Sequence, residues 1–188
     1  RRPLATGVPS VFLGGTMLGV RRMSSGSVKA PAVRPGGRKS PLSLRPMTAS
    51  DVSEVARIET TAFSTPWSER TFRSLLHRSG VELWVAEWGD QLAAYAILWK
   101  VLDEGELANI AVRTDLRGRG IGSGLLSRIL KVAEDSGVRR LYLEVRESNG
   151  VAREMYDRRG FQEIGVRKDY YEGPPEDARV LKKSLEGA

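Results

Sequence analysis

Cysteine is absent from this sequence of 188 residues, and histidine occurs once, at His77. Without cysteine the chain can form no disulfide, no cysteine-based zinc site and no cysteine acyl-enzyme intermediate. A Ser-His-Asp triad would need His77, but the stretch SLLHRSG is typical of a helix end, where a basic side chain near the last carbonyls is the simpler interpretation. The lack of cysteine fits a reducing compartment, and we expect a cytoplasmic protein.

Long apolar runs are also absent, and so are acidic residues in the first 50 positions. No run of about 18 apolar residues occurs, so no transmembrane helix is expected. The first 50 residues contain nine Lys or Arg and no Asp or Glu, whereas the remaining 138 contain 21 basic and 23 acidic side chains. The net charge of +7 therefore belongs to the N-terminal arm. We expect the folded part to bind neither nucleic acid nor a membrane.

The composition divides the chain near residue 41. Residues 1–41 are rich in Gly, Pro, Ser and Arg without a sustained period, which predicts a disordered basic arm. Within the arm, the mildly apolar residues 8–20 leave organelle targeting open as an alternative, and Met23 offers an alternative start that would make the first 22 residues an upstream artefact. Residues 42–188 are predicted to form one folded domain, as a monomer or weak dimer.

Regular patterning begins at Leu42 and alternates between periods typical of strands and helices. Locally paired strands come first, and later strands alternate with helices, which predicts an α/β or α+β domain with a mixed, mostly antiparallel sheet of about seven strands and helices on both faces. The expected strands are 42–47, 81–88, 92–101, 106–113, 139–147, 161–171 and 178–185. The expected helices are 48–63, 66–80, 121–137 and 149–160. Thr48 and Asp51 have capping-box spacing at the start of the first helix, and Ser68 is the expected N-cap of the second.

The glycine-rich stretch RGRGIG, residues 117–122, separates an expected strand from an expected helix. A helix N-terminus offers unpaired N–H groups, and glycine lets an anion approach them closely. The stretch lacks the Lys-Ser/Thr pair of a P-loop, and Ser123 breaks the G-x-G-x-x-G spacing. Residues alone leave two interpretations open, a phosphate cradle and a tight turn with solvated arginines.

Five segments in order resemble the GNAT superfamily of N-acetyltransferases, and within it the bacterial ribosomal-protein-alanine N-acetyltransferases. RGRGIG is similar to the R/Q-x-x-G-x-G/A signature. The other segments are FSTPWSERTF, VLDEGELANIAV, LEVRESNGVAREMYDRRGF and RKDYYEGPPEDARVLKKSL. The resemblance covers about residues 42–185. It implies a single GNAT-type domain with a splayed central strand pair, acetyl-CoA as cosubstrate and no metal.

The resemblance also implies where acetyl-CoA binds. Its pyrophosphate is expected on the backbone of residues 117–123, and its thioester along the strand before them. A free strand N–H aimed at the thioester oxygen would act as an oxyanion donor. The implied acetyl-CoA contacts are Ile110, Ala111, Val112, Arg117, Gly118, Arg119, Gly120, Ile121, Gly122, Ser123 and Asn149. From the residues alone, Asn149 is a plain helix N-cap.

Two residues are the candidates for proton transfer. Strand alternation places Tyr142, Glu144 and Arg146 on one face. From spacing alone, Glu144 is a solvated carboxylate paired with an arginine. We expect this strand to be internal, with helices covering both faces, so that burial would raise the pKa of Glu144 toward that of a general base. The resemblance implies that Glu144 accepts a proton and that Tyr156, otherwise a core tyrosine, protonates the departing thiolate.

The acceptor is expected to be the N-terminus of a protein, by resemblance that of a ribosomal protein. An α-amine has a pKa of roughly 7.7–8.0, so one modest base suits it better than it suits a lysine. The implied substrate residues are Trp67, Asp103, Glu104, Tyr170 and Tyr171. A GNAT enzyme of small amines, and a non-catalytic CoA-binding or ribosome-associated module tethered by the basic arm, are the alternatives.

Overall fold

The computed structural model describes residues 42–185. The predicted disordered arm, its targeting alternative and the alternative start lie outside the described residues. The strands are β1 (Leu42–Pro46), β2 (Val81–Trp88), β3 (Gln91–Val101), β4 (Glu104–Val112), β5 (Arg140–Arg146), β6 (Gln162–Glu172) and β7 (Pro175–Ser184). The helices are α1 (Val52–Ala62), α2 (Glu69–Leu75), α3 (Ile121–Asp135) and α4 (Gly150–Asp157), with short 3-10 turns at Ala49–Asp51 and Thr114–Leu116.

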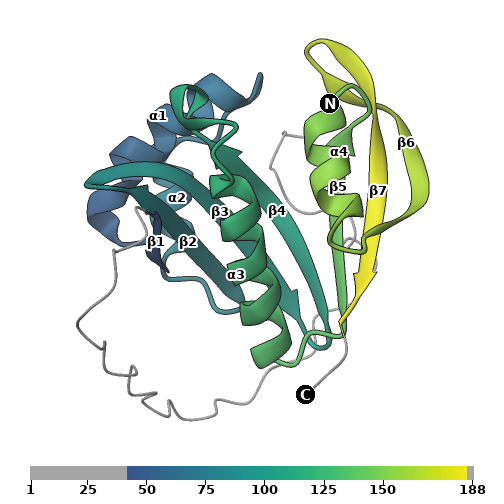
Figure 1. Cartoon of the computed structure of the whole chain (residues 1–188), viewed down its shortest axis with the longest axis horizontal. Coiled ribbons are helices and arrows are strands. Elements are labelled where there is room, and N and C mark those ends of the chain that lie inside the picture. Colours follow the sequence, from purple (N-terminus) through teal and green to yellow (C-terminus); the bar gives the residue numbers. More distant parts are fainter. Residues whose placement is uncertain (1–41, 186–188) are drawn as a thin grey trace, which may run out of the picture. The chain divides into compact units, whose positions relative to one another are not determined.

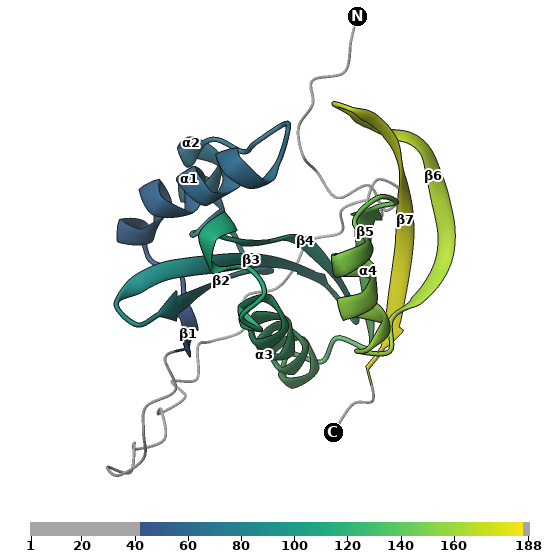
Figure 2. The same cartoon turned by 45° about the horizontal axis from the view of Figure 1, so that its top comes forward.

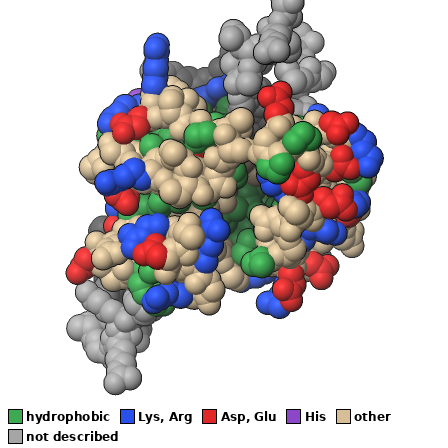
Figure 3. Space-filling model, turned by 90° about the horizontal axis from the view of Figure 1, so that it is seen from above, with side chains coloured by type: hydrophobic (Ala, Val, Ile, Leu, Met, Phe, Trp, Pro, Cys, Tyr) green, Lys and Arg blue, Asp and Glu red, His purple; other side chains and the backbone are tan. Residues whose placement is uncertain are grey.

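The strands form one mixed sheet in the order β1-β2-β3-β4-β5-β7-β6. All neighbouring strands are antiparallel except β4 and β5, which are parallel and pair only from Glu104↔Arg140 to Glu106↔Tyr142. Beyond that point the two strands diverge, as their ribbons do toward the top of Figure 1. The predicted fold class, with its splayed central pair, is therefore confirmed. We call this opening the fork; Figure 3 is seen from its open end.

Helices cover both faces of the sheet, and each face has its own apolar cluster. On one face, side chains of α3 such as Leu125 and Ile129 pack with β-strand residues and with Tyr156 of α4. On the other, Val55 and Ile58 of α1 pack with Phe72 of α2 and the opposite side chains of β3. Figure 2 shows α1 and α2 on one side of the sheet and α3 on the other. The fork lies between these two layers.

A bulge in β4 decides which of its side chains face each layer. Leu98 of β3 pairs with Leu107, but the next residue, Ile97, pairs with Asn109, so Ala108 is an extra residue in β4. Because one extra residue reverses the alternation, Glu106 and Asn109 both face the α1–α2 layer. Ile110 and Val112 consequently point into the α3 layer, where they pack against its apolar cluster.

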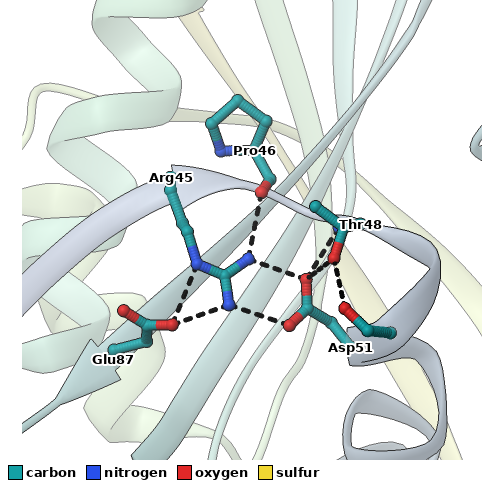
Figure 4. Close-up of polar contacts among 6 residues, drawn as sticks. Arg45, Pro46, Thr48, Asp51 and Glu87 are labelled. Atoms are coloured by element: carbon teal, nitrogen blue, oxygen red, sulfur yellow. Dashed lines mark hydrogen bonds and ion pairs between the residues drawn. The ribbon is translucent and has the colours of Figure 1, made fainter. Parts of the chain in front are cut away.

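The start of α1 is fixed by a polar cluster (Figure 4). The Arg45 guanidinium donates to both carboxylate oxygens of Asp51, at 2.7 and 2.8 Å, and its Nε donates to Glu87 at 2.9 Å. Asp51 also accepts from the Thr48 N–H at 2.7 Å, which confirms the predicted capping-box spacing. The hydrogen bond from Arg45 is the main cause that lowers the pKa of Asp51 to about 2.

The second helix begins where predicted but ends earlier. Ser68 is its N-cap and accepts a hydrogen bond from the Thr71 N–H at 3.2 Å. The helix ends at Leu75 rather than near Gly80, because the chain turns there and the Gly80 carbonyl accepts from the Lys100 N–H at 2.7 Å. His77 therefore follows a helix end, as its sequence context indicates.

Candidate active site

The fork leaves backbone donors of β4 without a strand partner. The Arg113 N–H donates to the Ala93 carbonyl of β3 at 2.8 Å. Because N–H groups alternate sides along an antiparallel pair, the Ala111 N–H also points to β3, whereas those of Ile110 and Val112 point toward β5. At that level β5 has already diverged. Two of the three predicted thioester contacts are therefore unpaired donors that face the fork, and Ala111 is not.

The stretch RGRGIG forms a tight turn at the open end of the fork. Gly118 and Gly120 have φ of +75° and +77°, a conformation that L side chains rarely adopt. A Cβ at either position would meet no atom within 4 Å, so the space above the turn is open. The Arg117 Nε donates to the Val112 carbonyl at 3.2 Å. This contact ties the turn to the end of β4, which leads into the fork.

The turn leads directly into the N-terminus of α3. The first helical bond runs from the Gly124 N–H to the Gly120 carbonyl at 2.9 Å, so the N–H groups of residues 121–123 precede the helical bonding pattern. They lie at the positive end of the helix dipole. Open space, three free N–H groups and a glycine backbone fit a pyrophosphate group. Arg159 of the chain after α4 holds the Ser123 hydroxyl at 2.7 Å.

Asn149 caps α4 on the other side of the fork. Its Oδ1 accepts a hydrogen bond from the Ala152 N–H at 3.2 Å, which is the N-cap role that the residue type alone indicates. The cap uses the side-chain oxygen. A contact between Asn149 and acetyl-CoA stays a prediction.

Glu144 lies on the face of β5 that looks toward the α1–α2 side, and its side chain is 10% exposed. The Arg167 guanidinium of β6 forms an ion pair with it. The expectation that helices cover both faces of β5 is wrong, because buried Leu141, Leu143 and Val145 alternate with half-buried residues. The Glu144 face is instead covered by side chains such as Arg167 from β6, which reach across β7, the strand that lies between β5 and β6. The structure thus brings Glu144 together with an arginine that the sequence analysis did not single out.

Both predicted tyrosines of β6 approach Glu144. The register between β6 and β7 passes from Arg167↔Ala178 to Tyr171↔Glu176, so β6 bulges between them, and Asp169 has a φ of +50°. The bulge lets adjacent Tyr170 and Tyr171 reach the same site. Burial raises the pKa of Tyr170, and its hydrogen bond to Glu144 raises it further. Burial, followed by the charge of Glu144, raises the pKa of Tyr171 to about 12.

Tyr156 is a buried core tyrosine of α4. Its side chain is 4% exposed, and its ring packs against Phe161 with centroids 5.6 Å apart. Burial raises the pKa of its phenol, and the nearby Tyr171 phenol raises it further. Tyr171 therefore interacts with Tyr156 on one side and with Glu144 on the other. The two predicted catalytic residues are linked through it.

Trp67 lies between α1 and α2, and a buried carboxylate holds it there. Glu59 of α1 accepts hydrogen bonds from the Trp67 N–H at 2.9 Å and from the Asn109 side chain at 3.4 Å, and also from the Tyr95 hydroxyl. Burial raises the pKa of Glu59. The loop that carries Trp67 is thereby fixed to Asn109 of β4, directly before the predicted thioester contacts at residues 110–112.

Asp103 and Glu104 lie at the closed end of the fork, Asp103 in the turn after β3 and Glu104 as the first residue of β4. Both carboxylates pair with Arg140, at 2.9 Å for Asp103 and 3.2 Å for Glu104. These two carboxylates therefore contact the start of β5 rather than Trp67 or the tyrosines of β6. Their role in substrate binding stays a prediction.

Arg146 connects two segments that are far apart in the sequence. Its guanidinium donates to Glu176 at 3.0 Å and to the Gly173 carbonyl at 3.1 Å in the β6–β7 turn, and to the Ser64 hydroxyl at 3.2 Å after α1. It also lies 4.0 Å from the centroid of the Tyr171 ring. These residues border a surface pocket of about 260 Å³. Arg146 thus holds the α1–α2 loop and the β6–β7 turn together.

The sequence analysis missed four residues of this region: Glu59, Glu106, Arg146 and Arg167. The signal for Glu106 is an acidic residue inside the mostly apolar strand segment GELANIAV, whereas Glu59 lies in a helix with several other polar residues and has no such signal. For Arg146 and Arg167 no sequence signal separates them from the other arginines.

The described residues combine a mixed seven-stranded sheet that opens between two parallel strands with a glycine turn and a helix N-terminus at the open end, a geometry suited to hold the phosphates of a cofactor. The model of the Acetyltransferase (GNAT) family matches residues 52–161. The chain belongs to this family, whose members use acetyl-CoA.

Among characterised relatives, the chain is similar to the [ribosomal protein bS18]-alanine N-acetyltransferase of Escherichia coli (strain K12). The two are 38% identical over 133 residues, which cover 71% of this chain and 88% of the relative. The enzyme of the same name from Haemophilus influenzae is 38% identical over 67% of this chain and 85% of its own.

Solved structures agree with this assignment of the fold. The crystal structure of the ribosomal-protein-S18-alanine N-acetyltransferase from Escherichia coli has a TM-score of 0.72 at 34% identity and covers 78% of this chain and 96% of that one. A Salmonella typhimurium protein solved with its cofactor acetyl-CoA has a TM-score of 0.66 at 18% identity, a likeness of fold alone. No helix within residues 42–185 is long and apolar enough to cross a membrane.

Proposed function

We propose that this protein transfers the acetyl group of acetyl-CoA to the N-terminal α-amine of a protein, and that its main substrate is the N-terminal alanine of a ribosomal protein of the bS18 type. The observation that supports this most directly is the fork itself. It places unpaired donors of Ile110 and Val112 on β4 opposite a partly desolvated carboxylate, Glu144, on β5. The names of the relatives supply the substrate class.

Acetyl-CoA would lie between β4 and α4. The N–H groups of residues 121–123 and the open turn at Gly118 and Gly120 would hold its pyrophosphate, with Arg117 and Arg119 as additional positive charges. When bound, it supplies an activated acetyl group. The N–H groups of Ile110 and Val112 would donate hydrogen bonds to the carbonyl oxygen and stabilise negative charge that develops there.

Proton transfer would be divided between the two sides of the fork. The substrate ammonium has to lose a proton before its nitrogen can attack, and Glu144 faces the side from which a peptide would enter. Tyr156 is held on the α4 side, where it would protonate the departing sulfur. A phenol whose pKa is raised by burial stays protonated at neutral pH and can serve as the acid. No covalent acyl-enzyme is needed, in agreement with the absence of cysteine.

The peptide would enter between the α1–α2 loop and the β6–β7 turn, the two segments that Arg146 connects. Trp67 and the two tyrosines of β6 would form the walls of this entrance. In Figure 3, acidic side chains are more frequent toward the right, on the side of β6 and β7 in Figure 1. Acidic side chains around the entrance would favour the binding of a positively charged amine.

The catalytic domain in this proposal is residues 42–188, and the basic arm is not part of the active site. We expect a variant that begins at residue 42 to retain acetyl transfer. A loss of transfer to peptides in that variant would assign a catalytic role to the arm.

The test is acetyl transfer to a panel of peptides, measured by mass spectrometry. The peptides share one sequence and differ only in the first residue, Ala, Ser, Met or Pro, and a matched peptide with a blocked N-terminus and an internal lysine serves as the control. We expect acetylation of the Ala peptide, little of the others and none of the blocked control. Transfer to spermidine or an aminoglycoside without transfer to any peptide would instead identify an enzyme of small amines. Binding of acetyl-CoA without any transfer would indicate a non-catalytic module.

A further inference from the structure

A second carboxyl group lies at the closed end of the fork, on the same face as Glu144. Glu106 of β4 is opposite Tyr142 in the last pair before the strands diverge. Glu144 is two residues beyond Tyr142, so it points to the same side of β5. Paired residues of parallel strands point to the same face, and therefore Glu106 and Glu144 are diagonal neighbours across the start of the fork.

Within residues 42–185, Glu106 forms no ion pair or hydrogen bond through its buried Oε2. The residue is 7% exposed, and its buried Oε2 has no hydrogen-bond partner among the described residues. Trp99, which faces it from β3, also has a buried indole N–H without a partner within residues 42–185. Most structural carboxylates at such depth are paired. A buried, unpartnered carboxyl is typical of a functional group.

Charged groups from two elements act on Glu106. The negative charge of Glu144 on β5 opposes its ionisation, and the positive charge of Arg167 on β6 favours it. Arg167 is paired directly with Glu144. From β3 the facing group is the neutral indole of Trp99, and the Arg78 guanidinium lies 4.6 Å from the centroid of that ring. Burial and the charge of Glu144 together raise the pKa of Glu106 to about 7.

We propose that Glu106 and Glu144 work as one coupled carboxylate pair, in which ionised Glu106 makes Glu144 a proton acceptor for the substrate ammonium despite the adjacent Arg167. This inference rests on the proposed function and adds to it a residue that acts through Glu144. Coulomb coupling between two carboxyl groups is reciprocal, so a change of charge on either one acts on the other.

The proton transfer from the substrate ammonium to Glu144 needs no further reactant. An N–H bond of the ammonium breaks, its proton forms an O–H bond on Glu144, and the electron pair stays on nitrogen for the attack. When Glu106 is ionised, the side chains of Glu106, Glu144 and Arg167 together carry one net negative charge. They become neutral as a group when Glu144 takes up the proton. While Glu106 is protonated, the same step leaves Arg167 as an uncompensated cation. The second state is less favourable in a partly desolvated site.

The first test follows side-chain carboxyl resonances of glutamate by ¹³C NMR as a function of pH, without substrate. We expect one resonance to titrate near pH 7 and to be absent in Glu106→Gln. It should titrate at lower pH in Glu144→Gln, because the like charge is gone, and at higher pH in Arg167→Gln. Glu82→Gln, which removes an ion-paired carboxylate on β2, is the matched control and should leave it unchanged. A Glu106 resonance unaffected by Glu144→Gln would overturn the pair.

The second test is the pH dependence of acetyl transfer. In Glu106→Gln we expect kcat to fall about tenfold, the effect of a coupling of roughly one pH unit, with an unchanged KM for acetyl-CoA. The group that limits activity on the acidic side should titrate at lower pH than in the wild type. An unchanged kcat and pH profile would overturn the proposal. If the wild type transfers no acetyl group to any amine, the proposed function fails, whereas the NMR titration still decides whether the pair exists.

Discussion

Removing the buried carboxyl of Glu106 should make the protein more stable at neutral and alkaline pH. The pKa of Glu106 in the folded protein is about 7, compared with an ordinary value of 4.5. Below pH 4.5 the carboxyl is protonated in the folded and the unfolded chain alike. As the pH rises toward 7, the unfolded chain ionises first, so the free energy of unfolding decreases. At about 1.4 kcal/mol per pH unit the full effect is about 3 kcal/mol.

In Glu106→Gln this loss should not occur, because the amide does not titrate and has nearly the shape of a protonated carboxyl. Urea denaturation of both proteins between about pH 4.5 and 8.5 measures the difference. We expect similar stability at the acidic end and an advantage of about 2 to 3 kcal/mol for the variant at the alkaline end. Glu82→Gln serves as the control. A difference between Glu106→Gln and wild type that does not change with pH, or that has the opposite sign, would refute the reasoning.

Three further predictions concern other parts of the structure. Asp51→Asn should remove a stabilisation of about 1 to 2 kcal/mol that is present above pH 3.8 and is lost as the pH falls toward 2, where wild type and variant should converge in acid denaturation. Gly120→Ala should lower stability by about 1 to 2 kcal/mol, because φ is +77° there, and should raise the KM for acetyl-CoA; an unchanged Tm would contradict the strain argument. Arg146→Ala should raise the KM for the peptide several-fold while leaving that for acetyl-CoA unchanged, since it separates the α1–α2 loop from the β6–β7 turn; equal changes in both constants would contradict this.

The elements of the fold could be predicted because their signals are local. The seven strands and four helices follow from periodicity, from caps such as Ser68 and from glycines at turns. The glycine turn before α3 was located in the same way, since positive φ at Gly118 and Gly120 requires glycine. The end of α2 was misjudged by several residues, because the tertiary contact between Gly80 and Lys100 ends it.

The candidate site depends on contacts between residues far apart in the sequence. Spacing placed Glu144 on one face of a strand, but not its partner Arg167, which is 23 residues away. The prediction that a helix covers the Glu144 face of β5 was also wrong, because side chains of β6 cover that face. The bulges in β4 and β6 cannot be derived from period 2, yet they decide that Ile110 and Val112 face α3 and that adjacent tyrosines reach one carboxylate.

The sequence by itself determined the fold class, the position of the phosphate-type turn and, through family resemblance, the proposed proton acceptor and donor. These follow from residue type and local order along the chain. Only the tertiary structure decided which β4 donors lack a strand partner in the described part of the chain, which arginine meets Glu144, and that Glu106 is buried beside it with an Oε2 that no described residue hydrogen-bonds. Charge and burial at a site are properties of the assembled surroundings, because a pKa depends on neighbours that the order of residues does not bring together.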